Sequence, residues 1–349
     1  MFVIDNGYLS QFLKLVDRNN AYFRFNGEIN LFIGEQCYKI VIRGKVMDKK
    51  PLIRKWLAIG IILLFVGVTI APTIAQNTEK SQTSRGTWLY VGGSGPGNYT
   101  RIQDAIDNAS EGDTVFVYSG LYNENIEINK SIVVSGQDRN TTFIVGENDS
   151  QIIQISDCSV EFKRFTVQKH NNTNLIGITI DNCWSSHIYE NYVKSCDIGI
   201  SIDFSESIIV SNNTILNCTL GIWDVVTRNV TITDNRIEGN RKGIGIEVEL
   251  TIFKNYIKRN SIANNSVGVY LFFALFSVVR ENNFIGNQQQ ASFFDSFFSV
   301  WHQNYWNQSH LSPKLILGGV GSQWIPPRIP IINFDWHPAQ EPYDIPRMR

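Results

Sequence analysis

The sequence predicts an all-β fold, a right-handed parallel β-helix built as a solenoid of roughly 22-residue coils. The segment 190–224 nearly repeats itself, so that Cys196 and Cys218 stand 22 residues apart in similar surroundings. Short β-branched runs alternate with corners rich in Gly, Asn and Asp, and no helical periodicity interrupts them between residues 151 and 294. Because an imperfect period sustained over many copies is typical of a solenoid, this periodicity decides the fold class.

A hydrophobic segment near the N-terminus precedes the repeats. An uncharged run at 56–70 follows a basic stretch at 49–55 and leads into small residues that end at Ala75. These features predict a signal peptide at 47–75 with cleavage after Ala75. The alternative is an uncleaved transmembrane anchor formed by residues 56–75, because the segment is also long enough to span a bilayer.

Either alternative exports the rest of the chain, since the basic flank stays inside. Met47 would make an ordinary start, so residues 1–46 are interpreted as an upstream extension from a mis-assigned start or as a short cytoplasmic segment. Residues 76–90 are expected to be a linker. The formal charge of the whole chain is −1, which provides no basic footprint and argues against nucleic acid as a partner.

The repeats predict which residues stack. About 22 residues at roughly 3.3 Å each close one turn of a three-sided coil, and parallel neighbours pair about 4.8 Å apart. Identical positions then lie above one another, so an inward-pointing Asn at a corner bonds the Asn of the coils above and below. The Asn-x-apolar element at this corner predicts a structural ladder of Asn191, Asn213, Asn235, Asn260, Asn283 and Asn304.

Both ends of the solenoid, predicted at 91–300, need covering because open ends expose unpaired strand edges. Residues 100–109 place apolar side chains at helical spacing behind Thr100 and Gln103, a pair typical of a capping box. An amphipathic capping helix is therefore predicted at the N-terminal end. Residues 301–349 lose the period and gain Pro and Trp, so they are predicted to form a C-terminal cap or tail.

Three features carry a family resemblance: the segment 94–136, the Asn and Gly-Ile coils, and the closing segment 332–345, INFDWHPAQEPYDI. Together they resemble secreted right-handed parallel β-helix proteins of the pectin-lyase-like superfamily, closest to NosD-type surface β-helices of archaea. The resemblance covers about residues 90–345 and specifies the fold well. For the activity it implies a polysaccharide lyase, hydrolase or epimerase, or a non-enzymatic carbohydrate-binding module. The NosD type further implies periplasmic copper delivery.

Copper delivery requires clustered His, Cys or Met donors. His302 and His310 lie near the C-terminal cap and could converge with His337, but no close local pair such as His-x-His occurs. Isolated surface histidines are the simpler interpretation. The residues therefore predict no metal site, and a NosD-type copper-binding role ranks third among the functions considered.

Acidic side chains follow the Gly-Ile element of several coils at one repeat position. Asp181, Asp203 and Glu247 are expected to form an outer carboxylate edge, with Asp224 one step out of register. Paired carboxylates about 5 to 10 Å apart serve sugar chemistry, and Ca²⁺ takes several such oxygens. The alternative is that Asp simply opens the turn after each strand. No cofactor is required by either interpretation, although the edge would suit Ca²⁺.

Four cysteines remain behind the hydrophobic segment. Cys196 and Cys218 share a register, and Cys158 and Cys183 nearly do. Neighbouring coils bring such positions within the range of a disulfide, which an exported protein can keep. The alternative is a ladder of free thiols.

The predicted function is an exported cell-surface module, carbohydrate-associated or structural, without an assured active site. Its expected partner is an extracellular polysaccharide, with Trp184 and Trp223 at coil corners as sugar-stacking candidates, and the membrane is contacted only through residues 56–75. The alternative function is a polysaccharide lyase or epimerase that uses the carboxylate edge, with or without Ca²⁺. No catalytic residue of the superfamily can be transferred to a position of this chain.

Overall fold

A computed structural model describes most of the chain, which divides into a unit at Met1–Asn77 and a unit at Thr78–Arg349. The described residues are 23–33, 36–46, 86–146, 151–169, 175–247, 254–307, 313–320 and 329–345. In the first unit, β1 (Phe23–Ile33) and β2 (Gln36–Val46) form an antiparallel hairpin. The predicted signal or anchor segment at 47–75 lies outside the described residues. Within them, no helix has the length and hydrophobicity of a membrane span.

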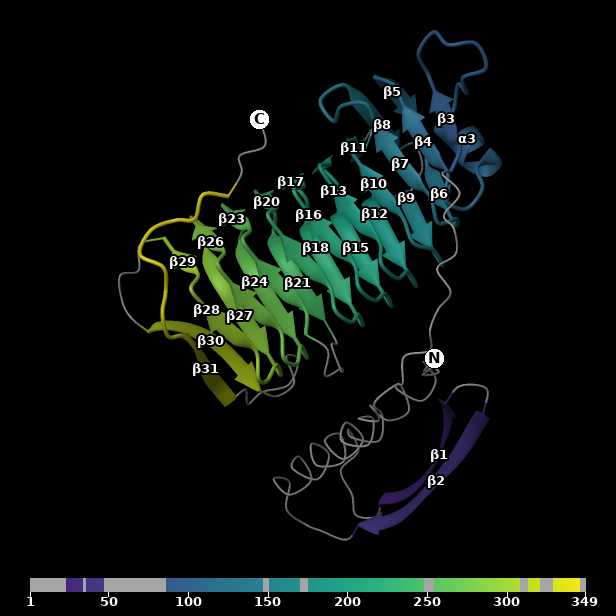
Figure 1. Ribbon diagram of the computed structural model, residues 1–349. Coiled ribbons are helices and arrows are strands. Elements are labelled where there is room, and N and C mark those ends of the chain that lie inside the picture. Colours follow the sequence, from purple (N-terminus) through teal and green to yellow (C-terminus); the bar gives the residue numbers. More distant parts are fainter. Residues whose placement is uncertain are drawn as a thin grey trace. The chain divides into compact units, whose positions relative to one another are not determined.

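The second unit is a parallel β-helix whose complete coils each contribute one strand to each of three parallel ladders (Figure 1). The first ladder is formed by β6 (Ile126–Ile128), β9 (Gln151–Ser156), β12 (Ile176–Asp181), β15 (Ile198–Asp203), β18 (Leu220–Val225), β21 (Lys242–Glu247), β24 (Val267–Phe272) and β27 (Gln289–Phe294). The second ladder is formed by β3 (Trp88–Val91), β4 (Thr114–Val117), β7 (Val133–Gly136), β10 (Glu161–Lys163), β13 (His187–Tyr189), β16 (Ile209–Ser211), β19 (Thr231–Thr233), β22 (Tyr256–Lys258), β25 (Val278–Arg280) and β28 (Val300–His302). The third ladder is formed by β5 (Gly120–Asn123), β8 (Thr142–Gly146), β11 (Thr166–Lys169), β14 (Tyr192–Lys194), β17 (Thr214–Leu216), β20 (Arg236–Glu238), β23 (Ser261–Ala263), β26 (Asn283–Ile285) and β29 (Tyr305–Trp306).

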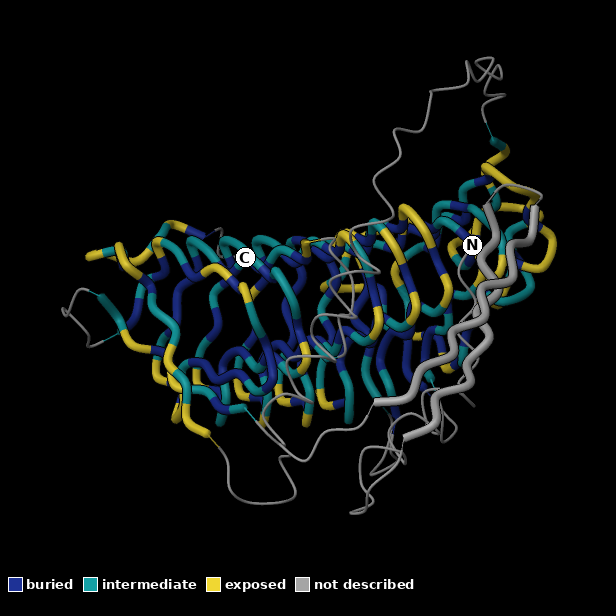
Figure 2. The backbone as a smooth tube through the Cα atoms, turned by 90° about the horizontal axis from the view of Figure 1, so that it is seen from below, coloured by how far each residue is buried: buried dark blue, intermediate teal, exposed yellow. Residues whose placement is uncertain are grey.

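Stacked β-branched side chains form the interior. Ile178 pairs with Ile200, Ile200 with Ile222 and Ile222 with Ile244, and all four are fully buried. Buried and less buried positions alternate around every coil, so a continuous apolar interior runs along the solenoid (Figure 2). Because each inward column repeats the same shape, removing this apolar surface from water stabilises the stacking of coils in one register.

A ladder of buried asparagines joins the coils at the corner between the second and third ladders. The backbone N–H and the side-chain Nδ2 of Asn213 both donate to Oδ1 of Asn235, at 2.9 and 3.1 Å. Asn235 donates in the same way to Asn260, at 3.0 Å from both nitrogens. Each Nδ2 also donates to a main-chain carbonyl of the preceding coil, as Asn235 does to Val210 at 2.8 Å. The side chains thus satisfy polar groups that the turn would otherwise leave buried and unpaired.

One member of the predicted ladder is wrong. The position above Asn260 is held by Asn282 and not by Asn283: N and Nδ2 of Asn260 donate to Oδ1 of Asn282, and Asn282 donates to Asn304. Asn283 is the first residue of β26, and its side chain exchanges two 2.8 Å hydrogen bonds with the main chain of Tyr343. The asparagines that form the ladder are Asn191, Asn213, Asn235, Asn260, Asn282 and Asn304.

A second asparagine column, which the sequence analysis missed, lies at the corner between the third and first ladders. Asn240 donates to Asn265, and Asn265 donates to Asn287, each through N and Nδ2 at 2.9 to 3.1 Å. Cys218 lies directly below in this column, where its N–H donates to Oδ1 of Asn240. The column therefore begins with thiols and continues with amides.

The disulfide alternative is not what the structure shows, because the four described cysteines are buried free thiols. The thiols donate to main-chain carbonyls, as Cys196 does to Lys194 at 3.4 Å and Cys218 does to Leu216 at 3.5 Å. The physical reason is geometric: equivalent positions in neighbouring coils point the same way about 4.8 Å apart. A disulfide requires its two Cβ atoms closer together, at about 3.8 Å.

The N-terminal helix is present, but a different residue caps it. α3 (Ile102–Asn108) is shorter than the predicted 100–109, and its N-cap residue Arg101 makes no side-chain capping bond. Instead the buried carboxylate of Glu124 accepts hydrogen bonds from N–H of Ile102 at 2.9 Å and of Gln103 at 3.1 Å. A carboxylate is favourable there because it satisfies free N–H groups at the positive end of the helix dipole.

The C-terminal boundary also differs from the prediction, because the last coil continues through β28 and β29 to Trp306 rather than ending at residue 300. Beyond it, β30 (Lys314–Val320) and β31 (Ile329–Asp335) form an antiparallel hairpin that pairs with the last coil. Buried Asp335 accepts from N and Nδ2 of Asn304 and from Nε1 of Trp306, at 2.8 to 3.1 Å. This carboxylate is the terminal acceptor of the asparagine ladder.

We expect Asn235→Ala to lower the free energy of unfolding by about 3 kcal/mol, because it leaves buried partners on Asn213 and Val210 unsatisfied. Urea unfolding monitored by circular dichroism measures the change. Asn123→Ala, which removes an exposed asparagine at the end of β5, should change stability by less than about 0.5 kcal/mol. Equal effects of the two substitutions would contradict a structural role for the ladder.

Candidate functional site

The outer face of the first ladder brings together side chains from five successive coils. In each six-residue strand the fourth residue faces outward, which places Thr179, Ser201, Trp223, Gly245 and Tyr270 in one column of register partners. The column changes from small hydroxyl side chains to aromatic ones along the solenoid. Each of these strands is paired on both sides, so the side chains are held on a rigid scaffold.

Two aromatic rings of this column lie parallel although they belong to coils that are not neighbours. The rings of Trp223 and Tyr270 are 6.5 Å apart between centroids, with only 8° between their planes. Gly245 lies between them in register and makes this arrangement possible. A Cβ at Gly245 would come within 2.0 Å of Cζ3 of Trp223, so the indole lies directly over the glycine backbone.

A cation accompanies the two rings. Nζ of Lys242, from the same strand as Gly245, lies 4.6 Å from the ring centroid of Trp223 and 3.9 Å from that of Tyr270. Both distances are within the range of a cation–π interaction. Burial lowers the pKa of Lys242, and Glu247 at the end of the strand partly opposes this effect. We call Trp223, Lys242, Gly245 and Tyr270 the aromatic platform.

Carboxylates border the platform along the neighbouring column. Asp181 and Asp203 are register partners in adjacent coils, and Glu247 follows two coils later with Val225 in between. Burial raises the pKa of all three carboxyl groups, and for Asp203 the charge of Asp181 adds to the effect. The predicted edge is therefore brought to one face, but its third member is separated from the other two.

Hydroxyl groups adjoin the first two carboxylates. Oγ of Ser201 donates to Oδ2 of Asp203 at 2.9 Å. Oγ1 of Thr179, in the same outward column, is buried and has no hydrogen-bond partner among the described residues. A buried hydroxyl without a partner carries a desolvation cost, so this position favours a ligand or a water molecule.

The described residues of this face provide no donor set for a metal ion. Ca²⁺ takes six to eight oxygen ligands, whereas the column offers one adjacent carboxylate pair. Throughout the described part of the chain, no group of three or more His, Cys, Asp or Glu side chains is placed to hold a metal. The rings of His302 and His337 do approach to 5.9 Å, while His310 lies outside the described residues.

Asp224 lies beneath the platform, inside the solenoid, at a position where the neighbouring coils have Ile202 and Ile246. It is fully buried, and its carboxyl oxygens accept hydrogen bonds from Oγ1 of Thr227 and from Nδ2 of Asn255. Burial raises the pKa of Asp224 to about 7. The out-of-register acid of the sequence analysis is therefore a core residue that supports the strand of Trp223.

The two predicted tryptophans differ in their surroundings. Trp223 belongs to the platform and lies within β18, not at the predicted coil corner, whereas Trp184 is 52% exposed at a corner, where its backbone forms an isolated parallel β-bridge with Glu206. Lys242, Gly245 and Tyr270 were missed. The sequence does contain a signal for Gly245 and Tyr270. Once the register of the coils is known, the fourth residue of each strand that contains a Gly-Ile element gives the members of the outward column.

Comparisons with known proteins find one matching family and several similar solved structures. The family model described as "Periplasmic copper-binding protein (NosD)" matches residues 106–321, more than half of the chain. Comparison with curated protein sequences finds no match. The A-module of the Azotobacter vinelandii mannuronan C-5 epimerase AlgE4 is similar at 14% identity and a TM-score of 0.45, covering 58% of this chain and 73% of that chain. Pectin methylesterase PemA from Erwinia chrysanthemi is similar at 11% identity and a TM-score of 0.29, covering 67% and 82%.

We expect the stability of the protein to fall between about pH 4 and pH 8 through Asp224. Its pKa is raised on folding, so its stabilising contribution is complete below the unfolded value of 3.8 and is lost as the pH rises to about 7. The loss amounts to up to about 4 kcal/mol. In Asp224→Asn this part of the pH dependence should disappear in urea unfolding measured at pH 5 and pH 8.

Glu206→Gln serves as the control, because Glu206 is an exposed carboxylate of the same solenoid. It should retain the pH dependence of the original protein. If Asp224→Asn retains it as well, the buried acid does not titrate as described.

Proposed function

The chain belongs to the NosD family, and from this premise we propose that its β-helix is an exported module that binds a polysaccharide along the outer face of the first ladder. The observation that carries the proposal is the pair of parallel rings of Trp223 and Tyr270 over Gly245. The family description, periplasmic, supports export. Attachment to the membrane and a position on the cell surface are further parts of the proposal.

The chemistry of the platform suits a sugar chain. Pyranose rings have an apolar face of C–H groups, which packs on the face of an aromatic ring whose π-electrons are negative. Their hydroxyl groups require donors and acceptors nearby, and Lys242, Ser201 and the carboxylates of Asp203 and Glu247 supply both. A mostly apolar surface with a few well-placed polar groups is typical of sites that bind small organic ligands.

The linear arrangement suits a polymer rather than a single sugar. Thr179, Ser201, Trp223, Gly245 and Tyr270 occur at successive coils, about 4.8 Å apart along the solenoid. A ligand that lies along this column contacts several coils at once. Binding through several weak contacts then gives affinity that a monosaccharide lacks.

Copper, which the family description names, does not fit the described residues. Copper sites use clustered thiolate, thioether or imidazole donors. The thiols are buried in the interior, and the neighbouring thiol together with burial raises the pKa of Cys158 and of Cys196. The described part of the chain offers two adjacent imidazoles, His302 and His337, and no third donor with them. We derive no step through copper.

A second candidate function, a polysaccharide lyase or epimerase, is favoured by the adjacent carboxyl groups of Asp181 and Asp203. Burial raises the pKa of both groups, which is the environment that a general acid requires. The test is turnover of alginate and polygalacturonate, with and without Ca²⁺, followed by the absorbance of unsaturated products and by NMR. Turnover that Asp203→Asn abolishes would establish the enzyme, and binding without turnover would exclude it.

The binding proposal predicts that Trp223→Ala and Tyr270→Ala each weaken binding of a polysaccharide about tenfold, equivalent to about 1.4 kcal/mol. Affinity electrophoresis in gels that contain soluble neutral or acidic polysaccharides measures the effect as a loss of retardation. Trp336→Ala removes an exposed indole of the C-terminal hairpin and should leave binding unchanged. Retardation that is insensitive to both platform substitutions would refute the proposed site.

A further inference from the structure

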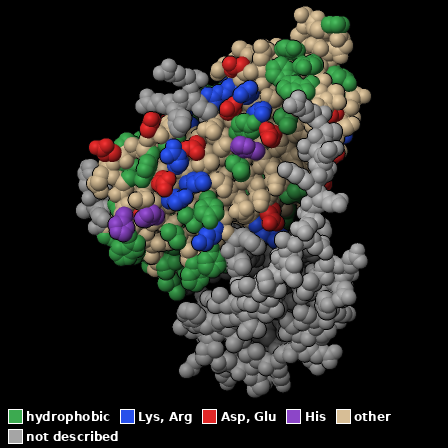
Figure 3. Space-filling model, viewed as in Figure 1, with side chains coloured by type: hydrophobic (Ala, Val, Ile, Leu, Met, Phe, Trp, Pro, Cys, Tyr) green, Lys and Arg blue, Asp and Glu red, His purple; other side chains and the backbone are tan. Residues whose placement is uncertain are grey.

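A second face of the solenoid carries aromatic side chains that the platform does not use. Trp88, Tyr90 and Phe116 project from β3 and β4 of the second ladder, and Tyr118 follows β4. Trp88 is 55% exposed and Tyr90 is 40% exposed. The ring centroids lie 5.2 to 6.2 Å apart. In Figure 3, hydrophobic side chains gather at the end of the solenoid that carries β3 and β4.

Register continues this aromatic face along two outward columns of the second ladder. Tyr90 pairs with Phe116, and the same column continues through Ser135 and Lys163 to Tyr189. The neighbouring column runs from Trp88 through Thr114, Val133 and Glu161 to His187, again by register pairs. The two columns therefore cross five coils without interruption.

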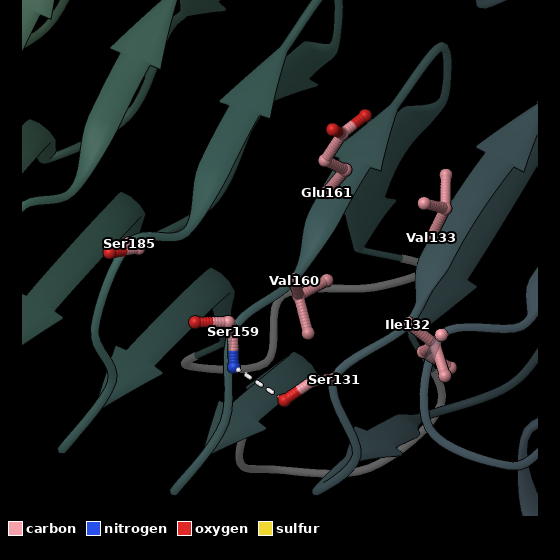
Figure 4. Close-up of a pocket in the computed structure, with 8 residues that line it drawn as sticks. Ser131, Ile132, Val133, Ser159, Val160, Glu161 and Ser185 are labelled. Carbon is pink, nitrogen blue, oxygen red and sulfur yellow. Dashed lines mark hydrogen bonds between the residues drawn. The ribbon is translucent and has the colours of Figure 1, made fainter. Parts of the chain in front are cut away.

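A depression of about 240 Å³ lies where the aromatic part of this face meets the polar part. Ile132, Val133 and Val160 contribute apolar surface to it, while Ser131, Ser159 and Ser185 line its corner side. Glu161 and Val133 point to the same side of the sheet in the close-up, and N–H of Ser159 donates to Oγ of Ser131 at 3.2 Å (Figure 4). Its lining contains one acid and no base.

The acid of the depression is held in place and electrically neutralised. Oε2 of Glu161 accepts from Nζ of Lys163 at 3.3 Å and from the hydroxyl of Tyr189 at 3.1 Å. Nζ of Lys163 also donates to the hydroxyl of Tyr189 at 2.5 Å, which closes a triangle. All of these contacts of the carboxylate use Oε2, and the side chain is 50% exposed, so Oε1 has no partner among the described residues and can accept from a ligand.

The imidazole next to this carboxylate carries no charge either. The ring of His187 stacks on Tyr189 at 4.1 Å, and its Nε2 lies 2.8 Å from Oγ of Ser211. Burial lowers the pKa of His187, so the imidazole is neutral at neutral pH. Burial alone would raise the pKa of Glu161, but the hydrogen bonds from Lys163 and Tyr189 outweigh it and lower the pKa. The carboxylate therefore stays ionised and paired with Lys163, and the lining of the depression contributes no cation for an anionic ligand.

We propose that the outer face of the second ladder, from Trp88 to Tyr189, is a second polysaccharide-binding track, and that it takes a neutral chain. The exposed rings stack on pyranose faces, and the depression beside Glu161 receives one sugar ring, whose hydroxyl donates to Oε1. An apolar floor flanked by hydroxyls and a neutralised carboxylate suits an uncharged, hydroxyl-rich ligand. The inference rests on the proposed function of the module, but it concerns different residues and a different face.

The test is affinity electrophoresis of the full-length protein in gels that contain either a neutral or an acidic polysaccharide. The probes are soluble mannan and glucan, with alginate and polygalacturonate as acidic probes. We expect the double variant Trp88→Ala/Tyr90→Ala to weaken binding of a neutral probe at least about tenfold, and Glu161→Gln to weaken it severalfold. Phe298→Ala, which removes an exposed aromatic side chain elsewhere on the solenoid, is the matched control and should bind as the original protein does.

The platform variants separate this inference from the proposed function. Trp223→Ala/Tyr270→Ala should bind the neutral probe more weakly than the original protein does, but it should retain the part of that binding that the second track supplies. If that variant loses all binding while Trp88→Ala/Tyr90→Ala and Glu161→Gln bind normally, the second track does not exist and the platform alone binds. If the original protein binds no probe, both proposals fail. If Trp88→Ala/Tyr90→Ala instead dissociates an oligomer in size-exclusion chromatography without affecting binding, the aromatic face joins copies of the chain and the inference is overturned.

Discussion

The hydrogen bond from each buried asparagine to the asparagine of the next coil is the interaction on which this structure depends. Hydrophobic burial favours compact stacking, but apolar columns of Ile and Val tolerate small shifts because the interaction has no direction. An amide that donates twice to a single oxygen does have a direction and a fixed length. Slipping by one residue would turn each inward Asn toward solvent and each outward side chain inward. The ladder therefore defines one register for the coils from Asn191 to Asn304.

Both proposed binding faces depend on the register in which neighbouring coils stack. Trp223 and Tyr270 are 47 residues apart in sequence, yet their rings are parallel because Gly245 separates them by one coil and leaves room for the indole. Lys163, Tyr189 and Glu161 meet for the same reason, since they occupy two neighbouring columns of adjacent coils. A solenoid thus builds sites by aligning residues at a repeat interval, and substituting one coil changes a site locally without altering the fold.

Much of this organisation was predictable from the sequence, because periodicity directly specifies a solenoid. The coils, the capping helix and the inward Asn corner follow from spacing alone. The error at Asn283 arose from following the Asn-x-apolar pattern, although the 22-residue interval from Asn260 points to Asn282. Other features depend on contacts between residues that are distant in sequence, which no local sequence pattern reveals. Glu124 caps a helix that begins 22 residues before it, and Asp335 ends the ladder from beyond the last coil. The platform needed the exact register before Gly245 and Tyr270 could be recognised.

Hydrogen exchange of the asparagine side-chain amides tests the central role of the ladder most directly. NMR can follow the Nδ2 protons of Asn213, Asn235 and Asn260 after transfer into deuterated water, alongside those of exposed asparagines. If these amides hold the register, their protons exchange only when the solenoid unfolds as a whole, orders of magnitude more slowly than the exposed ones. Exchange of the three buried side chains within minutes under native conditions would contradict the account.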